Sequence, residues 1–145
     1  MHFIDISDFK KNELKKIINF AKKIKKNPKK FHNLLKNKSI GLLFEKPSNR
    51  TRTSIDIGMK NIGGNVISLN KDEIGLGKRE SDSDIIRTLS LYIDCLIIRN
   101  NDHKKIKNLA KLNFIPIING LSNYSHPCQT LSDIFTMYLK FKSLF

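Results

Sequence analysis

The sequence contains few of the residues that mark secreted, disulfide-rich or membrane-spanning proteins. Its 145 residues include 2 cysteines, 4 prolines and no tryptophan. Cys95 and Cys128 lack metal-type spacing, which favours reduced thiols in a reducing compartment. No apolar run approaches the roughly 20 residues that cross a bilayer. The first residues form no apolar signal core and include acidic side chains, so we expect a cytoplasmic protein with no membrane partner.

Acidic residues are also scarce, at 13 against 27 lysines and arginines, for a net charge of +14. Such a charge raises the alternative of a nucleic-acid binder. Many lysines, however, lie among the first 38 residues at positions between helically spaced apolar ones, as on a solvated helix face. We therefore expect no nucleic-acid partner.

What the chain does have is an alternation of helical and strand-like segments. The short strands are rich in Ile, Leu and Val without polar alternation, as in a parallel sheet covered on both faces. This pattern predicts an α/β fold, a doubly wound and mostly parallel four-stranded sheet with helices on both faces. The expected helices are 7–26 with Ser7 as N-cap, 51–61, 83–92, 104–112 and one from 127 onward; the expected strands are 40–44, 66–69, 95–98 and 115–118, with a loop through 71–80.

In such sheets a ligand lies beyond the carboxyl ends of the strands. That rule selects three loops, 45–50, 99–103 and 119–127. In the first, Ser48, Thr51 and Thr53 supply hydroxyls where a helix begins, and helix N-termini bind anions. A guanidinium such as that of Arg50 matches phosphate oxygens in two-pronged fashion. The alternative is an ordinary helix cap with arginines on a solvated face.

The loop 119–127 ends in a second polar group. His126 and Gln129 are three residues apart, so both side chains can share one face where a helix begins. Arg99 ends the third strand, at the same edge of the predicted sheet. A capping histidine and a surface glutamine are the alternative, which the convergence with Arg99 weakens.

Four segments, in this order, resemble one family. The stretch FEKPSNRTRTS (44–54) resembles the S-T-R-T-R phosphate-binding motif of the aspartate and ornithine carbamoyltransferases. The segments IIR (97–99), INGLS (118–122) and HPCQTLSD (126–133) follow at the family's spacing. HPCQ after INGLS, with the opening HFIDISD, resembles the ornithine enzymes; an aspartate-type domain or a non-catalytic phosphate-binding or assembly module is the alternative.

The resemblance implies transfer of the carbamoyl group of carbamoyl phosphate to L-ornithine, giving L-citrulline and phosphate in arginine metabolism. No metal or other cofactor is expected. The implied carbamoyl-phosphate site consists of Ser48, Asn49, Arg50, Thr51, Arg99, His126 and Gln129. The first four hold the phosphate, Asn49 through its backbone. Arg99 and His126, with Thr51, polarise the carbamoyl oxygen, and Gln129 holds the carbamoyl amide.

Two positions depart from the family's pattern, and a third residue, Arg52, matches the pattern but is given another role. Asn49 replaces the usual Thr of S-T-R-T-R. Gly75 stands where ornithine enzymes commonly have a Gln that reaches a neighbouring subunit, and Lys78 or Arg79 is the candidate to supply that contact. Arg52 is expected to be structural, paired with Glu80.

The family's members are about twice as long as this chain. We expect residues 1–130 to form the carbamoyl-phosphate-binding domain and 131–145 to begin the linking helix, with the ornithine-binding domain absent. Its D-x-x-x-S-M-G and H-C-L-P motifs do not occur here. The resemblance further implies a homotrimer, and little or no turnover by these residues alone.

Overall fold

The computed structural model describes residues 1–46, 48–75 and 80–141. Within them a four-stranded sheet has the order β2-β1-β3-β4, and each neighbouring pair of strands is parallel. This confirms the predicted doubly wound α/β fold. The strands are β1 (Ser39–Phe44), β2 (Asn65–Leu69), β3 (Cys95–Arg99) and β4 (Ile117–Leu121). The helices are α1 (Lys11–Lys26), α2 (Asn49–Asn61), α3 (Lys71–Ile74), α4 (Asp82–Leu89), α5 (His103–Lys111) and α6 (Pro127–Phe141), with 3-10 turns at Ile6–Asp8 and Pro28–Phe31.

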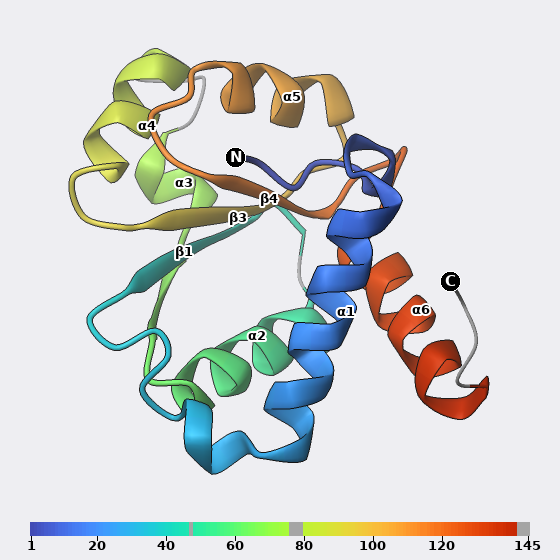
Figure 1. The fold of residues 1–145 in the computed structure, drawn as a ribbon. Helices are drawn as coiled ribbons and strands as arrows, with labels where there is room; N and C mark the ends of the chain where they lie inside the picture. The colour runs from blue at the N-terminus through green and yellow to red at the C-terminus, as the bar shows by residue number, and fades with distance from the viewer. Residues whose placement is uncertain (47, 76–79, 142–145) are drawn as a thin grey trace.

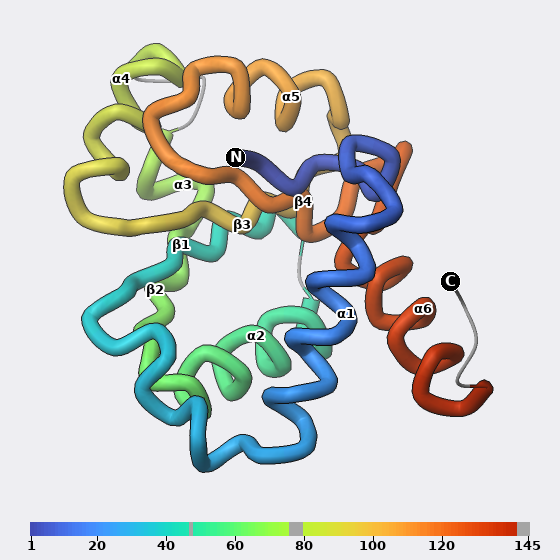
Figure 2. The backbone as a smooth tube through the Cα atoms, viewed as in Figure 1, coloured from blue at the N-terminus to red at the C-terminus, as the bar shows by residue number. Residues whose placement is uncertain are grey.

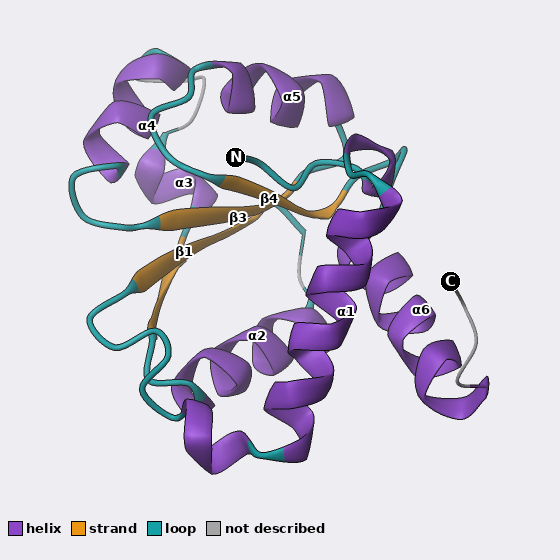
Figure 3. Ribbon diagram, in the orientation of Figure 1, coloured by secondary structure: helices purple, strands orange, loops and turns teal. Residues whose placement is uncertain are grey.

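Helices cover both faces of the sheet, as the strand sequences predict. Figures 1 and 3 show α3, α4 and α5 on one side, with α1 and α2 on the other. Side chains alternate along each strand, so Leu43 and Ile98 enter the larger core with α4 and α5. Leu42 and Ile97 enter the smaller core beneath α2, where they contact Met59. The sheet is thus held rigidly between two apolar layers.

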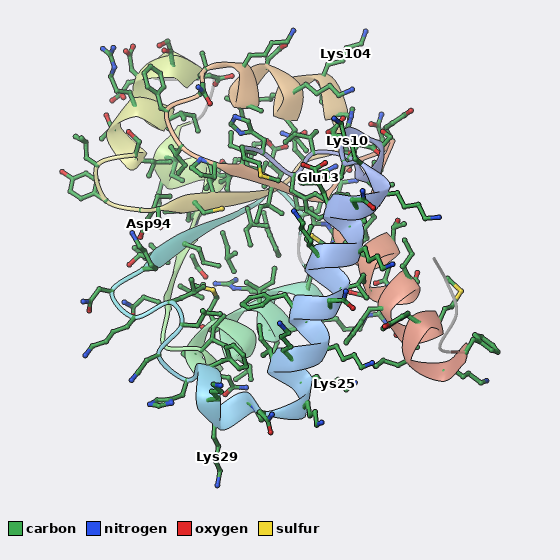
Figure 4. The ribbon with its side chains drawn as sticks, in the orientation of Figure 1. Lys10, Glu13, Lys25, Lys29, Asp94 and Lys104 are labelled. Atoms are coloured by element: carbon green, nitrogen blue, oxygen red, sulfur yellow. The ribbon has the colours of Figure 1, made fainter. Side chains whose placement is uncertain are left out.

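The first long helix begins later than expected, and Ser7 is not its N-cap. The Asp5 side chain instead accepts from the Ser7 backbone N–H at 3.1 Å and closes a separate 3-10 turn. Helix α1 starts at Lys11, and the Glu13 carboxylate accepts from the Lys10 backbone N–H at 2.8 Å. Figure 4 shows Lys29, just beyond α1, and Lys104 extending away from the body. The lysines of α1 are exposed, which confirms the solvated face.

Strand β4 lies at 117–121 rather than the expected 115–118 because residues Ile117 to Leu121 pair with β3, and the N-terminal segment pairs with its other edge. Phe3 bridges to Ile118, and its N–H donates to the Ile117 carbonyl at 2.8 Å. The Asn119 N–H donates in turn to the Phe3 carbonyl, also at 2.8 Å. Figure 2 shows this segment running along β4. As a result, Asn119 and Gly120 belong to the strand instead of the loop.

The segment 71–80, expected to be a loop, begins with the short helix α3. Asn70 caps it, because its side chain accepts from the Asp72 N–H at 3.1 Å. Gly75 ends it in the left-handed conformation, with φ of 66°. Helix α4 is shorter than the expected 83–92: it ends at Leu89 and a turn continues to Tyr92.

Candidate functional site

The strand order changes direction at β1, which has β2 on one side and β3 on the other. The crevice beyond the carboxyl ends of β1 and β3 is therefore the expected ligand position in this fold. Phe44 and Arg99, the last residues of these strands, are paired in register. The Glu45 N–H then donates to the Arg99 carbonyl at 3.0 Å. The predicted phosphate-binding loop therefore begins next to Arg99.

Helix α2 begins at Asn49, two residues earlier than the sequence suggests. Ser48 is its N-cap, with extended backbone at φ −152°, and its side chain makes no capping hydrogen bond. Asn49, Arg50 and Thr51 form the first turn, whose backbone N–H groups have no acceptor one turn back. These donors and the positive end of the helix dipole create a favourable place for an anion.

The two arginines of this turn lie against different depressions. Arg52 lines a cleft of about 530 Å³ together with Ser48, Glu45 and Lys71. Arg50 lines a more open depression along α2, with Asn49. The predicted Arg52–Glu80 pair does not form, although both residues lie in the described part of the chain. Arg52 is therefore a second cation at the mouth of the site.

Arg99 and His126 are close enough for their charges to interact. His126 precedes Pro127, the first residue of α6, and its Nδ1 is buried without a hydrogen-bond partner. Burial lowers the pKa of His126, the Arg99 guanidinium lowers it further, and the Asp133 carboxylate opposes both. Burial and Arg99 thus favour the neutral imidazole, which holds one N–H donor and one acceptor.

Gln129 lies in the first turn of α6, three residues after His126, but its side chain is exposed. The amide Nε2 donates to the Asp133 carboxylate at 2.8 Å. The donor end of Gln129 is therefore engaged within α6, and its predicted contact with a ligand stays a prediction.

The predicted contact with a neighbouring subunit falls mostly outside the described residues. Lys78 and Arg79 lie there. Gly75 is described and is buried at the end of α3, where its N–H donates to the Lys71 carbonyl at 3.1 Å.

The INGLS segment (118–122) holds the loop that leads to His126 in place. Asn119 is fully buried, and its Nδ2 donates to the Ile4 carbonyl at 3.0 Å. Ser122 contacts the His103 ring nitrogen Nδ1 at 2.8 Å. These contacts hold the loop that leads to His126.

The two cysteines are unsuited to nucleophilic chemistry. Burial raises the pKa of the Cys95 thiol to about 11, and it raises the pKa of Cys128 as well. Since the thiolate is the reactive form, both side chains are inert at neutral pH.

Sequence reasoning missed two residues at this edge, Glu45 and Asn100, which hydrogen-bond to each other across β1 and β3. Their only signal was polarity directly after a buried strand. Across the described ranges, His, Cys, Asp and Glu form no cluster suited to a metal ion. Nor does any helix in that part of the chain have the length and apolar character to span a membrane.

Comparison with known proteins gives the same picture over nearly the whole chain. Residues 1–139 match the family model described as aspartate/ornithine carbamoyltransferase, carbamoyl-P binding domain. The ornithine carbamoyltransferase of Methanocaldococcus jannaschii is 40% identical over 137 residues, covering 94% of this chain and 45% of that protein.

Solved structures agree with the fold described above. The ornithine carbamoyltransferase of Pyrococcus furiosus superimposes with a TM-score of 0.92 at 38% identity, over 98% of this chain and 46% of that one. A variant of N-acetyl-L-ornithine transcarbamylase, solved with carbamyl phosphate and N-succinyl-L-norvaline, gives 0.84 at 32% identity, over 99% and 49%. The chain spans about half the length of these relatives. The chain belongs to the aspartate/ornithine carbamoyltransferase family, whose carbamoyl-phosphate-binding domain it matches.

Proposed function

We propose that this chain binds carbamoyl phosphate and serves in the transfer of its carbamoyl group to L-ornithine. The observation that carries the proposal is that two groups of polar residues lie at the same edge of the sheet. The anion-binding first turn of α2 and the Arg99–His126 pair lie at one sheet edge, within the match to a carbamoyl-phosphate-binding family model.

The phosphate end of the ligand occupies the start of α2. Backbone N–H groups of Asn49, Arg50 and Thr51, with the hydroxyls of Ser48 and Thr51, donate to its oxygens. Arg50 closes over the phosphate with a bidentate guanidinium. The Ser48 hydroxyl makes no capping bond, which leaves it available as such a donor.

The carbamoyl end lies toward Arg99 and His126. In the reaction, the amine nitrogen attacks the carbamoyl carbon, and negative charge develops on the carbonyl oxygen. The guanidinium and the N–H of a neutral imidazole stabilise that charge as fixed donors. The carbon–oxygen bond to phosphate then breaks, and the departing phosphate takes the proton that the attacking nitrogen loses. Phosphate departs into a site that already favours an anion. Gln129 orients the carbamoyl amide once its side chain releases Asp133.

Citrulline formation requires an ornithine site in addition to this edge of the sheet. The chain spans 45% of the Methanocaldococcus relative. We propose that these 145 residues bind the phosphate substrate but turn over little by themselves, in a cytoplasmic homotrimer. A sedimentation mass near 16.7 kDa, that of one chain, would contradict the trimer.

The binding proposal is tested with Arg50→Ala, Arg52→Ala and the matched charge control Lys29→Ala. Calorimetric titration with carbamoyl phosphate should show about 10- to 100-fold weaker binding for Arg50→Ala, because a charged hydrogen-bonded pair contributes about 1.5–3 kcal/mol. Lys29→Ala should change affinity less than about twofold, since Lys29 is exposed and lies toward the opposite end of α2 from its first turn. If Arg52→Ala alone abolishes binding, the phosphate belongs to the cleft that Arg52 lines, and the assignment of Arg50 is wrong.

A further inference from the structure

The carboxylate of Glu45 lies at the sheet edge that carries the candidate site, yet the proposed reaction gives it no role. Its side chain is only 16% exposed. One oxygen, Oε1, accepts from Asn100 Nδ2 at 2.5 Å, and the other lies 3.4 Å from the Lys71 ammonium. A carboxylate that is nearly buried beside an anion site opposes anion binding unless its position provides something in return.

The partner of Glu45 is itself fixed by several elements. Asn100 is 5% exposed, and its Oδ1 accepts from the Asp102 N–H at 2.7 Å, at the start of α5. The Asn100 backbone N–H donates to the Leu121 carbonyl, at the end of β4, at 3.1 Å. The Glu45 carboxylate is therefore attached to a rigid junction of β3, β4 and α5.

Glu45 also joins the two halves of the site along the chain. Its backbone N–H donates to the Arg99 carbonyl at 3.0 Å, and Ser48, the N-cap of α2, follows three residues later. The hydrogen bond to the Arg99 carbonyl fixes the backbone of Glu45, and the hydrogen bond from Asn100 fixes its side chain. Glu45 is thus fixed next to Arg99 and lies three residues before the N-cap of α2.

We infer that Glu45 is a positioning residue, which fixes the spacing between the phosphate-binding turn and Arg99 so that one ligand engages both. The inference rests on the proposed function. It implies that Glu45 matters for a ligand that carries a carboxamide as well as a phosphonate, and matters little for a ligand that carries the phosphonate alone.

The hydrogen bond and the ion pair of Glu45 can be separated by substitution. Glu45→Gln keeps an acceptor for Asn100 and loses the charge opposite Lys71. Lys71→Met removes the ion pair alone, and a pair with one partner 40% exposed contributes little. Glu45→Ala removes both interactions. Asn100→Asp removes the donor and sets two carboxylates against each other.

The test measures binding of phosphonoacetamide, a stable analogue with a methylene in place of the bridging oxygen, and of methylphosphonate, which lacks the carboxamide. Titration calorimetry of the full chain should show phosphonoacetamide binding about tenfold weaker for Glu45→Ala, with methylphosphonate within about twofold. Glu45→Gln should recover most of the loss, and Lys71→Met should leave the ratio of the two affinities unchanged.

An equal loss for both ligands in Glu45→Ala would overturn the positioning role, since it would indicate general damage to the fold. Unchanged binding of phosphonoacetamide would overturn it too. If Glu45→Ala does not fold, Asn100→Asp gives the same test, with the same selective loss expected. Wild-type chain that binds neither ligand would refute the proposed function itself, an outcome visible before any variant is made.

Discussion

The imidazole of His126 is the titratable group on which the proposed chemistry depends most. Three influences act on it: burial and the Arg99 guanidinium lower its pKa, and the Asp133 carboxylate raises it. Because Asp133 also accepts from Gln129 at 2.8 Å, the carboxylate links His126 and Gln129, two of the residues assigned to the carbamoyl end. A change at either neighbour should therefore be visible at His126.

We predict an order for the pKa of His126 in three proteins. Arg99→Met should raise it above the wild-type value, because a repelling positive charge is removed, and Asp133→Asn should lower it, because an attracting negative charge is removed. NMR titration of the imidazole Cε1 proton measures each midpoint, and Lys29→Ala serves as the charge control. A wild-type midpoint above 6.5, or the reverse order, would contradict this electrostatic description.

The same shift predicts how stability depends on pH. The folded pKa of His126 is depressed, so the unfolded chain binds the proton more readily. The free energy of unfolding should therefore fall as pH drops below about 6.5, and level off below the folded pKa. Urea denaturation at several pH values should show a smaller fall for His126→Gln. An identical fall in both proteins would assign the effect to another group.

At the scale of an element, helix α2 is bounded by a position that requires glycine. Gly63 has φ of 85°, and a Cβ there would lie 2.5 Å from the His32 carbonyl oxygen. Gly58, inside the same helix, has no atom within 4 Å of the place where its Cβ would be. The backbone and its neighbours therefore require glycine at position 63, whereas position 58 has room for a larger residue.

Alanine at these two glycines should act in opposite directions. Gly63→Ala should destabilise by about 1–3 kcal/mol, through backbone strain and the clash with His32. Gly58→Ala should stabilise by about 0.5–1 kcal/mol, because alanine favours the helix interior. Urea denaturation midpoints at constant m-value measure both. A loss of stability in Gly58→Ala would show that its open face is in use.

The elements themselves were largely predictable, because local apolar periodicity determines them. Strands β1, β2 and β3 each lie within one residue of their predicted limits. Strand β4 was placed too early because its limits depend on its register with β3, a pairing between segments about twenty residues apart. Ser7 was wrong as a cap because Asp5 accepts its N–H. Both errors concern hydrogen bonds that a hydrophobic pattern does not encode.

The residues of the candidate site likewise fall into those that a local pattern predicts and those that it does not. Ser48, Arg99 and His126 lie at the end of a strand or just before a helix, so the rule for parallel sheets predicts where they lie. Glu45 and Asn100 look like ordinary loop residues, and their importance depends on a hydrogen bond between positions 55 residues apart. The Arg52–Glu80 pair had no local signal either, and it does not form.

For the whole molecule, binding and turnover should be separable. The purified chain should bind phosphonoacetamide and yield little or no citrulline from carbamoyl phosphate and L-ornithine, because nothing assigned in these residues positions the amine. A colorimetric citrulline assay, with a full-length family member as reference, measures the rate. A rate of citrulline formation near that of the reference would refute the separation of binding from turnover.

The pairing of Phe3 with Ile118 also sets an order of events during synthesis. Phe3 leaves the ribosome long before its partners, because residues 117–119 are made later. Until then the edge of β3 that β4 will cover remains open, with unpaired backbone groups that attract other strands. The nascent chain is therefore most exposed to aggregation, and most in need of a chaperone, just before its fourth strand arrives.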